Sequence, residues 1–168
     1  MRGAWLAQKI ESAHAIPNLE WTIEFAKSID ARSHQYVFFG DSIRHKNGSR
    51  IDDAWRCICE AVTFIDSTKE RWWEAEVQRT AGEIARQSPD QDAVKTAGYF
   101  ENALTVARRQ HAKSWELRAS MSMARLWRDQ GKRAEARELL APVYGWFTEG
   151  FDTLDLKEAK ALLDELSS

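Results

Sequence analysis

Side chains that could carry chemistry are scattered along this 168-residue chain. A metal ion held on a helix needs ligands three or four residues apart, and neither the histidines nor the cysteines provide such a pair. The four histidines are His14, His34, His45 and His111. The serines and threonines lack the context of a nucleophile elbow, and no Gly-x-x-x-x-Gly-Lys-Ser/Thr loop could hold a phosphate. We therefore predict no metal, no cofactor and no catalytic residue.

Both cysteines lie in the tripeptide Cys57-Ile58-Cys59. On a helix, residues two positions apart point about 200° away from each other, so these two thiols cannot form a disulfide together. Cys57 falls on an apolar stripe and is predicted to be a small core residue. Reduced thiols also fit a cytoplasmic protein.

The charged residues favour a structural or binding role over acid–base chemistry. Most carboxylates stand at helical spacings from Lys or Arg, and we predict that nearly all lie on solvated helix faces. The net charge is −2, which gives no bulk attraction to nucleic acid. No apolar run approaches the ~20 residues that cross a membrane, and the first residues lack a signal-peptide core. We expect a cytoplasmic protein with neither nucleic-acid nor membrane partners.

Three arginines, Arg44, Arg86 and Arg128, each close a copy of one pentapeptide that recurs every 42 residues. Each copy begins with a small residue and has one or two apolar residues before the arginine; the copies are 40–44, 82–86 and 124–128. A fixed period of this size is typical of a solenoid built from helix pairs. Such repeats mostly bind other proteins, so the period predicts a binding function.

A second set of positions confirms the period, after steps of 42 and 40 residues. Each set has the spacing a, a+3, a+4, a+7, a+8, which is one apolar stripe on an α-helix. The three stripes are Ala54, Cys57, Ile58, Ala61 and Val62; Thr96, Tyr99, Phe100, Ala103 and Leu104; and Ala136, Leu139, Leu140, Val143 and Tyr144. Each unit is therefore predicted to contain a first helix with the small residue and a second helix with the stripe.

We predict a single all-α domain over 1–168, a right-handed α-solenoid of antiparallel helix pairs with a C-terminal capping helix. Its expected parts are a partial N-terminal repeat at 1–32, repeat 1 at 33–67, repeat 2 at 70–110, repeat 3 at 113–148 and the capping helix at 153–168. The expected helices are 17–30, 33–47, 50–66, 70–87, 91–110, 113–129, 132–147 and 154–166.

The predicted helix boundaries rest on turn and capping signals. Asn47-Gly48-Ser49, Ser88-Pro89-Asp90 and Asp129-Gln130-Gly131 are turn sequences, and Pro89 forbids one continuous helix through its position. Thr153 is predicted to cap the last helix. The helix at 17–30 has the pattern of a second helix without its first, as expected for a remnant, a truncation or an excised piece.

The repeat positions resemble the tetratricopeptide pattern in divergent form. The small residues Ala124 and Ala136 stand twelve positions apart, as in that pattern, whereas the other two units have fourteen. Over 33–166 the chain also resembles the C-terminal repeat region of large bacterial regulators, which carry a nucleotide cyclase or a LuxR-type DNA-binding module, then an AAA-type ATPase, then helical repeats. The matching segments are 70–77, 113–119, 126–132 and 140–153, with Tyr-Gly-Trp-Phe-Thr-Glu-Gly-Phe-Asp at 144–152 the most specific. The resemblance implies a sensor or scaffold arm without an active site.

The tetratricopeptide resemblance implies a concave groove lined by the first helices, with Arg44, Arg86 and Arg128 pointing into it. Arg125 stands where the other units have an acid, so positive charge is expected to concentrate there, with His45 at the far end. Guanidinium groups present paired donors that suit a carboxylate. One hypothesis is therefore that these five residues bind a protein or an acidic peptide.

The alternative for these arginines is a purely structural role. Asp41 and Glu83 stand three residues before Arg44 and Arg86 and can pair with them within one helix. Arginine near a helix C-terminus also complements the helix dipole. Arg128 lacks such an acid three residues before it.

The eight tryptophans also allow two interpretations. Trp55, Trp73, Trp115 and Trp127 fall at recurring unit positions, which predicts packing between repeats. The alternative is an exposed aromatic patch for a partner, made of Trp72, Trp146, Phe147 and Phe151.

We therefore expect a non-catalytic protein–protein interaction module, a bacterial signalling scaffold or sensor arm. One alternative is self-association, as a homodimer through apolar residues in 3–30 that lack a preceding unit. Another is a small-ligand sensing arm of a regulator.

Overall fold

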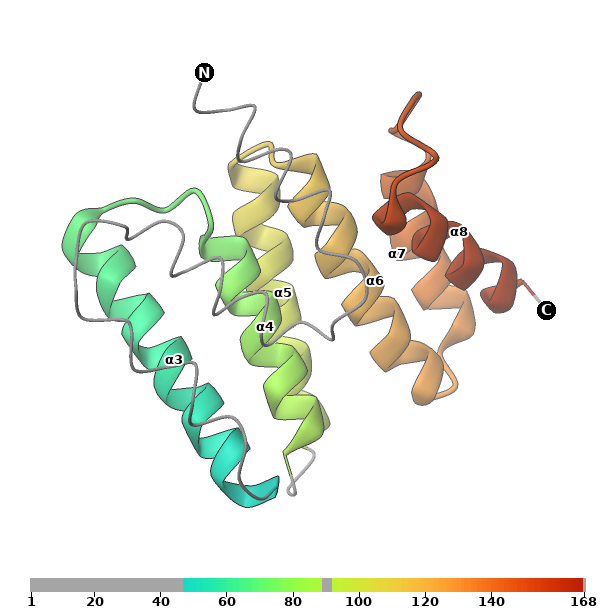
Figure 1. Cartoon of the computed structure of the whole chain (residues 1–168). Coiled ribbons are helices and arrows are strands. Elements are labelled where there is room, and N and C mark those ends of the chain that lie inside the picture. Colours follow the sequence, from blue (N-terminus) through green and yellow to red (C-terminus); the bar gives the residue numbers. More distant parts are fainter. Residues whose placement is uncertain (1–46, 89–91, 168) are drawn as a thin grey trace.

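The computed structural model describes residues 47–88 and 92–167. These residues form six α-helices: α3 (Asn47–Thr68), α4 (Glu74–Gln87), α5 (Ala93–Arg109), α6 (Lys113–Asp129), α7 (Arg133–Tyr144) and α8 (Leu154–Leu166). Each helix packs against the next one along the chain, as Figure 1 shows. The described residues are therefore all-α, as the periodicity predicts.

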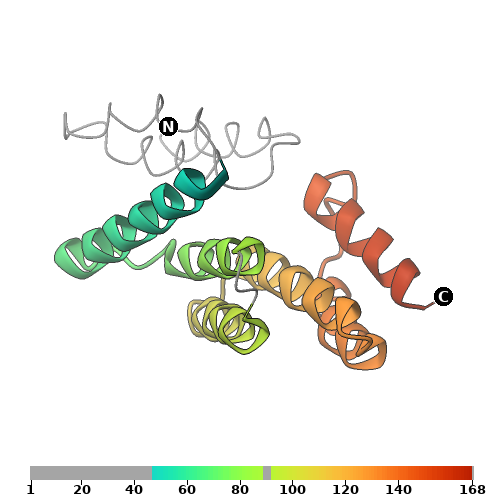
Figure 2. The ribbon, with the colours of Figure 1, turned by 90° about the horizontal axis from the view of Figure 1, so that it is seen from below.

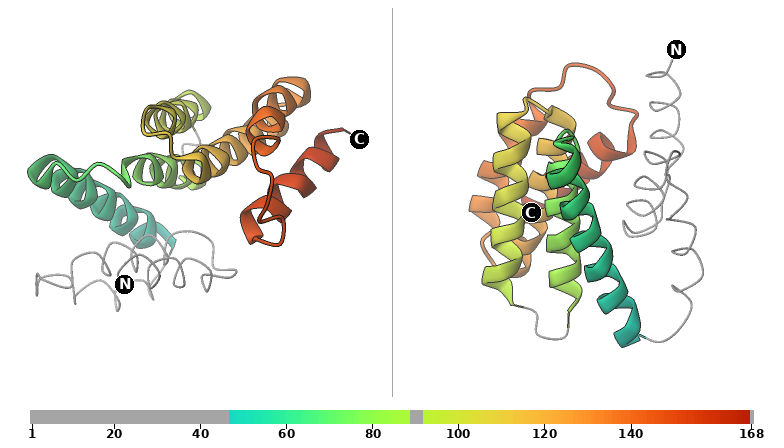
Figure 3. Two further views of the ribbon diagram at one scale, coloured as in Figure 1. Left: turned by 90° about the horizontal axis from the view of Figure 1, so that it is seen from above. Right: turned by 90° about the vertical axis from the view of Figure 1, so that its left-hand side faces the viewer.

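Contacts between alternate helices add a second level of order. α4 also packs against α6, and α6 against α8. Seen end-on, α5 and α7 lie on one side of the α4–α6 row and α8 lies on the other (Figure 2). The axes of α4, α5 and α6 run side by side (Figure 3). The row α4, α6, α8 therefore brings residues far apart in sequence into contact.

The helix boundaries follow the predicted ones to within three residues, except that α4 begins at Glu74, four residues later than predicted. α4 ends at Gln87, before Pro89, and α6 and α8 have the predicted bounds. The predicted turn at 47–49 is wrong, because α3 already begins at Asn47. Asn, Gly and Ser favour turns, but they are also preferred where a helix starts. α7 ends at Tyr144, three residues earlier than predicted.

The apolar stripes form the core between neighbouring helices. One cluster joins α3 to α4, a second joins α5 to α6, and a third joins α6, α7 and α8. The third contains Leu117, Met121, Leu140, Leu156 and Leu162, all buried. Burial of several such side chains contributes about 1.5–3 kcal/mol each, so α8 is firmly attached to the α6–α7 pair.

The recurring tryptophans pack between helices, as one of the two interpretations predicts. Trp73 is buried, and Trp55, Trp115 and Trp127 are half-buried against the core clusters. Trp55 also contacts the Tyr99 ring, at 5.7 Å between centroids. These rings stabilise the helix stack and offer little surface to a partner.

The second pentapeptide begins with Gly82, where the ring of Phe100 on α5 leaves no room for a side chain. A Cβ atom at Gly82 would lie 2.4 Å from a ring carbon of Phe100, which is fully buried on α5. In the next unit the equivalent positions are Ala124 and Leu140, both fully buried. Glycine therefore stands opposite the larger side chain, Phe100, and alanine stands opposite the smaller one, Leu140.

The turns after α5 and α6 are built alike. The N–H of Ala112 donates to the carbonyl of Ala107 at 2.9 Å, and that of Lys132 donates to Trp127 at 2.8 Å. Each of these hydrogen bonds runs to the residue five positions earlier, as in the C-terminal cap of a Schellman motif. The motif needs a left-handed residue, which is His111 with φ 54° in one turn and Gly131 with φ 80° in the other.

The N-terminal caps differ from the prediction in one case. Asp92 caps α5, because its Oδ1 accepts from the N–H groups of Val94 and Lys95 at 3.0 Å each. Thr153 stands at the N-cap of α8 but makes no side-chain cap bond, since its hydroxyl donates to the carbonyl of Gly150 at 2.7 Å. The hydroxyl is used instead to close the turn that precedes α8.

Candidate interaction surfaces

A buried network of charged side chains lies at the α4–α6 contact. Arg79 donates from Nε and Nη2 to the two carboxylate oxygens of Glu76 at 2.8 and 2.7 Å. Its Nη1 lies 3.6 Å from Oε1 of Glu83, which also accepts from the hydroxyl of Ser122 on α6 at 2.7 Å. All four residues are buried. Because each carboxylate has a partner, the network holds α4 to α6 without leaving an unpaired buried charge.

The environment of Arg79 keeps its guanidinium charged. Burial acts to lower the pKa of Arg79, but the attraction and hydrogen bonds of Glu76, together with Glu83, outweigh burial and raise this pKa above its ordinary value. A buried arginine with bidentate carboxylate contacts is a strong structural pair. The guanidinium has no proton to exchange near neutral pH, so Arg79 itself is not suited to acid–base catalysis.

The predicted solvated-face interpretation is wrong for three carboxylates. Glu76, Glu83 and Glu116 are buried, each beside arginine or lysine. A sequence signal for two of them exists at the 42-residue offset: Glu76 and Glu83 on α4 stand where α6 has Arg118 and Arg125. Opposite charges at equivalent positions of packed neighbouring helices indicate a contact between them rather than two solvated faces.

A row of three ion pairs joins α6 to α8. Arg118 Nε donates to Asp155 at 2.7 Å, Arg125 Nη2 to Glu158 at 2.8 Å, and Arg128 Nη1 to Glu165 at 3.0 Å. The pairs follow the same order along both helices. We call this set the α6–α8 ion-pair row. Arg118 also lies 3.8 Å from Glu76, so the row is linked to the buried network.

The arginines predicted to bind an acidic ligand are therefore already paired within the described residues. Arg128 is held by Asp129 as well as by Glu165, and the hydrogen bonds that it donates to these carboxylates raise its pKa. Arg86 donates to Glu83 at 3.2 Å, as the structural alternative predicts, and lies 3.9 Å from Asp129. Arg86 lies on α4, and Arg125 and Arg128 lie on the neighbouring helix α6; each has a carboxylate beside it. Arg44 and His45 lie outside the described residues.

The buried carboxylate at the start of α6 is held by two cations. Glu116 accepts from Lys113 Nζ at 2.7 Å and from Arg108 Nε at 3.0 Å. Burial acts to raise the pKa of Glu116, but these two hydrogen bonds outweigh it and lower the pKa below its ordinary value. Glu116 therefore joins α5 to α6 as an anion.

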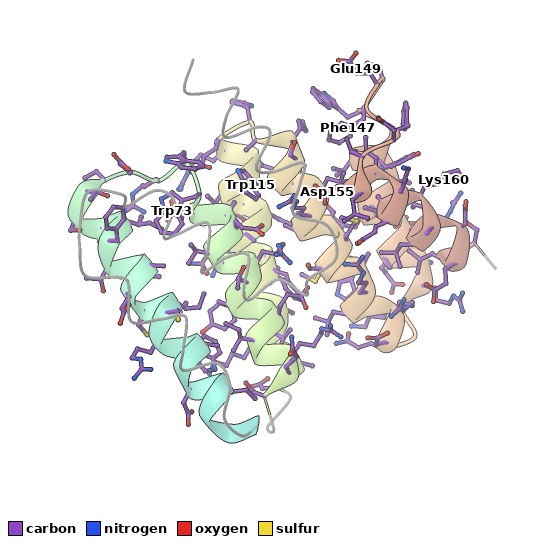
Figure 4. The ribbon with its side chains drawn as sticks, viewed as in Figure 1. Trp73, Trp115, Phe147, Glu149, Asp155 and Lys160 are labelled. Atoms are coloured by element: carbon purple, nitrogen blue, oxygen red, sulfur yellow. The ribbon has the colours of Figure 1, made fainter. Side chains whose placement is uncertain are left out.

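The loop between α7 and α8 exposes aromatic side chains. Trp146 is 57% exposed, Phe151 is 47% exposed and Leu154 is 39% exposed. Phe147 is half-buried against the α6–α7–α8 core and contacts Trp146 edge-on, with ring centroids 5.2 Å apart. Phe151 contacts Tyr144 at 5.9 Å. We call residues 145–154 the aromatic loop; Figure 4 shows Glu149 at its outer tip and Phe147 nearer the core.

The fourth residue of the predicted patch lies elsewhere. Trp72 is 45% exposed but belongs to the connection between α3 and α4. In Figure 1 the α5 and α6 helices separate that connection from the aromatic loop. The structure therefore brings Trp146, Phe147 and Phe151 together and places Trp72 at the α3–α4 end of the stack, away from them.

The remaining predictions concern the N-terminal segment, metal sites, membrane spans and the two cysteines. The segment 3–30, proposed as a dimer contact, lies outside the described residues. Within residues 47–88 and 92–167 no three His, Cys, Asp or Glu side chains gather as a metal site. No helix in these same ranges is long and apolar enough to cross a membrane. Cys57 is half-buried and Cys59 is exposed.

Compared with known proteins, the chain matches no family model, no curated protein and no solved structure.

Proposed function

We propose that this chain is a non-catalytic protein-interaction module whose partner binds the aromatic loop. Its helices would form a right-handed, tetratricopeptide-like solenoid, with α4–α5 and α6–α7 as antiparallel pairs and α8 as the cap. The alternate contacts α4–α6 and α6–α8 support this arrangement, because they are those expected between first helices of successive units. The scaffold would hold the loop at a fixed place.

The exposure of Trp146 and Phe151 in one loop carries the proposal. The recurring tryptophans of the helix pairs are buried or half-buried, so the chain has room for rings inside its core. Large exposed aromatic side chains that gather in one place mark protein-interaction sites, where Trp and Tyr dominate the binding energy. Phe147 packs against the core and contacts the Trp146 ring edge-on; a ring supported in this way loses less entropy on binding.

The arginines of α6 support a structural role more than a binding role. A carboxylate ligand at Arg125 or Arg128 would have to displace Glu158 or Glu165. These acids belong to α8, whose leucines are buried in the core. An acidic peptide would therefore compete with an interaction that is intramolecular and already formed.

The proposal is tested by capture with the immobilised full chain. We expect a partner to be retained from a host lysate by the wild type and lost with the variant Trp146→Ala/Phe151→Ala. The matched control is Val94→Ala, which removes an exposed apolar side chain from α5. A variant that retains the same partner at the wild-type level, with an unchanged melting temperature, would overturn the proposal.

A further inference from the structure

We infer that the aromatic loop recognises a positively charged segment of its partner, with lysine or arginine beside apolar residues. This inference rests on the proposed function and names the partner's chemistry at the same site. It follows from the charge of the loop, from the geometry of Trp146 and from the pairing of acids elsewhere in the row.

The loop contains two acids and no cation of its own. Between 145 and 154 it contains Glu149 and Asp152, both exposed, and no lysine or arginine. Neither carboxylate takes part in a salt bridge with any residue that the structure describes. In contrast, Asp155, Glu158 and Glu165 of the adjoining helix are all paired with arginines of α6. Uncompensated acid is therefore concentrated beside the exposed rings.

The aromatic rings of the loop suit a cation. The Nζ atom of Lys113 lies 5.7 Å from the centroid of the Trp146 ring, so this ring already forms one cation–π contact. Lys113 is paired with Glu116 at 2.7 Å, a carboxylate that it shares with Arg108. The ring remains more than half exposed, which leaves surface for a second cation. A lysine or arginine placed there would gain both the ring quadrupole and the nearby carboxylates.

The apolar part of the surface sets the rest of the partner's chemistry. Phe151 lies between the two acids in sequence, Leu154 follows them, and both are exposed. A purely charged ligand would leave them in water, whereas an apolar residue next to each cation would cover them. The complementary ligand is a polypeptide segment of mixed basic and apolar residues, and an acidic segment is repelled.

Two capped peptides that differ only in charge sign test the inference. Each has three leucines, combined with three arginines in one peptide and three glutamates in the other. We expect the arginine peptide, at about 1 mM, to shift amide resonances of residues 145–154 in nuclear magnetic resonance spectra of the full chain. The glutamate peptide should shift none of them. Raising the salt concentration from 50 to 500 mM should weaken binding several-fold, because exposed charges are screened.

Charge-removing variants distinguish the effect of the two loop acids on peptide binding from the effect of the protein's net charge. Glu149→Gln/Asp152→Asn should bind the arginine peptide about threefold to tenfold more weakly, since each exposed pair contributes up to about 1 kcal/mol. The control Glu101→Gln/Glu138→Gln removes the same charge from exposed sites on α5 and α7 and should bind as the wild type does. Equal weakening by both double variants would reduce the effect to net charge and overturn the inference.

The remaining outcomes distinguish this inference from the proposed function. Binding of the glutamate peptide, or of neither peptide, would overturn the cationic partner. If a captured partner is nevertheless lost with Trp146→Ala/Phe151→Ala but retained by Glu149→Gln/Asp152→Asn, the interaction function stands and only its chemistry is wrong. If capture survives both variants, the proposed function fails as well.

Discussion

At the scale of single residues, the contact between Gly82 and Phe100 has a testable cost. Alanine normally stabilises a helix interior by about 1 kcal/mol relative to glycine. Here its Cβ would lie 2.4 Å from the Phe100 ring, and overpacking costs about 1–3 kcal/mol. We therefore expect Gly82→Ala to lower the free energy of unfolding, as measured by urea denaturation. A stabilised variant would show that the ring can move aside.

The next unit supplies the compensating change. Ala124 and Leu140 occupy the equivalent positions, so Gly82→Ala/Phe100→Leu copies a pair that the chain already packs. The double variant should be more stable than the sum of the two single changes predicts, with a coupling energy of about 1 kcal/mol or more for residues in contact. Additive effects would contradict the proposed contact.

At the scale of elements, the two matching turns contain a built-in comparison. His111 and Gly131 both adopt the left-handed conformation, which costs a non-glycine residue about 1 kcal/mol. His111→Gly should therefore raise the melting temperature, and Gly131→Ala should lower it. Calorimetry checks both, and a lower melting temperature for His111→Gly would mean that the imidazole makes a compensating contact.

The contact between α5 and α6 predicts a pH dependence. The lowered pKa of Glu116 means that its carboxylate stabilises the fold above the unfolded pKa, near 4.5, and that this stabilisation is lost as the pH falls through the folded pKa. Glu116→Gln should be less stable than the wild type at pH 7, by about 1–3 kcal/mol for charged hydrogen bonds. The difference should shrink steadily below pH 4.5. Denaturation curves at pH 7 and pH 3 measure it, and a constant difference would contradict the assignment.

At the scale of the whole molecule, the α6–α8 ion-pair row joins the last helix to the stack. Arg125→Glu/Arg128→Glu would place like charges opposite Glu158 and Glu165. We expect a lower melting temperature, equivalent to about 1–2 kcal/mol, since exposed pairs contribute up to ~1 kcal/mol each. Adding Glu158→Arg/Glu165→Arg should restore it. A double variant as stable as the wild type would free these arginines for the groove hypothesis.

Most of the helices could be predicted from the sequence, whereas their contacts could not. Helical periodicity is local, so the stripe from Ala136 to Tyr144 and the break at Pro89 indicate elements without any tertiary information. The pairing of Arg125 with Glu158 spans 33 residues and depends on how α8 crosses α6. The rule that carboxylates lie on solvated faces likewise fails for Glu76 and Glu83, which the packing of α4 against α6 buries; only their opposite charge to Arg118 and Arg125 signals this. The sequence allows aromatic residues either to pack between helices or to form an exposed patch. Only the packing of the helices shows that Trp146 and Phe151 are exposed.

The order of charges along the row α4, α6, α8 constrains how such a chain can change length. Glu76 and Glu83 on α4 occupy the positions at which α6 has Arg118 and Arg125. These two arginines form ion pairs with Asp155 and Glu158 of α8. A gene duplication that copied the α6–α7 pair once would set arginine against arginine between neighbouring helices. Copying two successive pairs would keep opposite charges in contact at every step. In the solenoid proposed above, this order of charges would favour growth by even numbers of units.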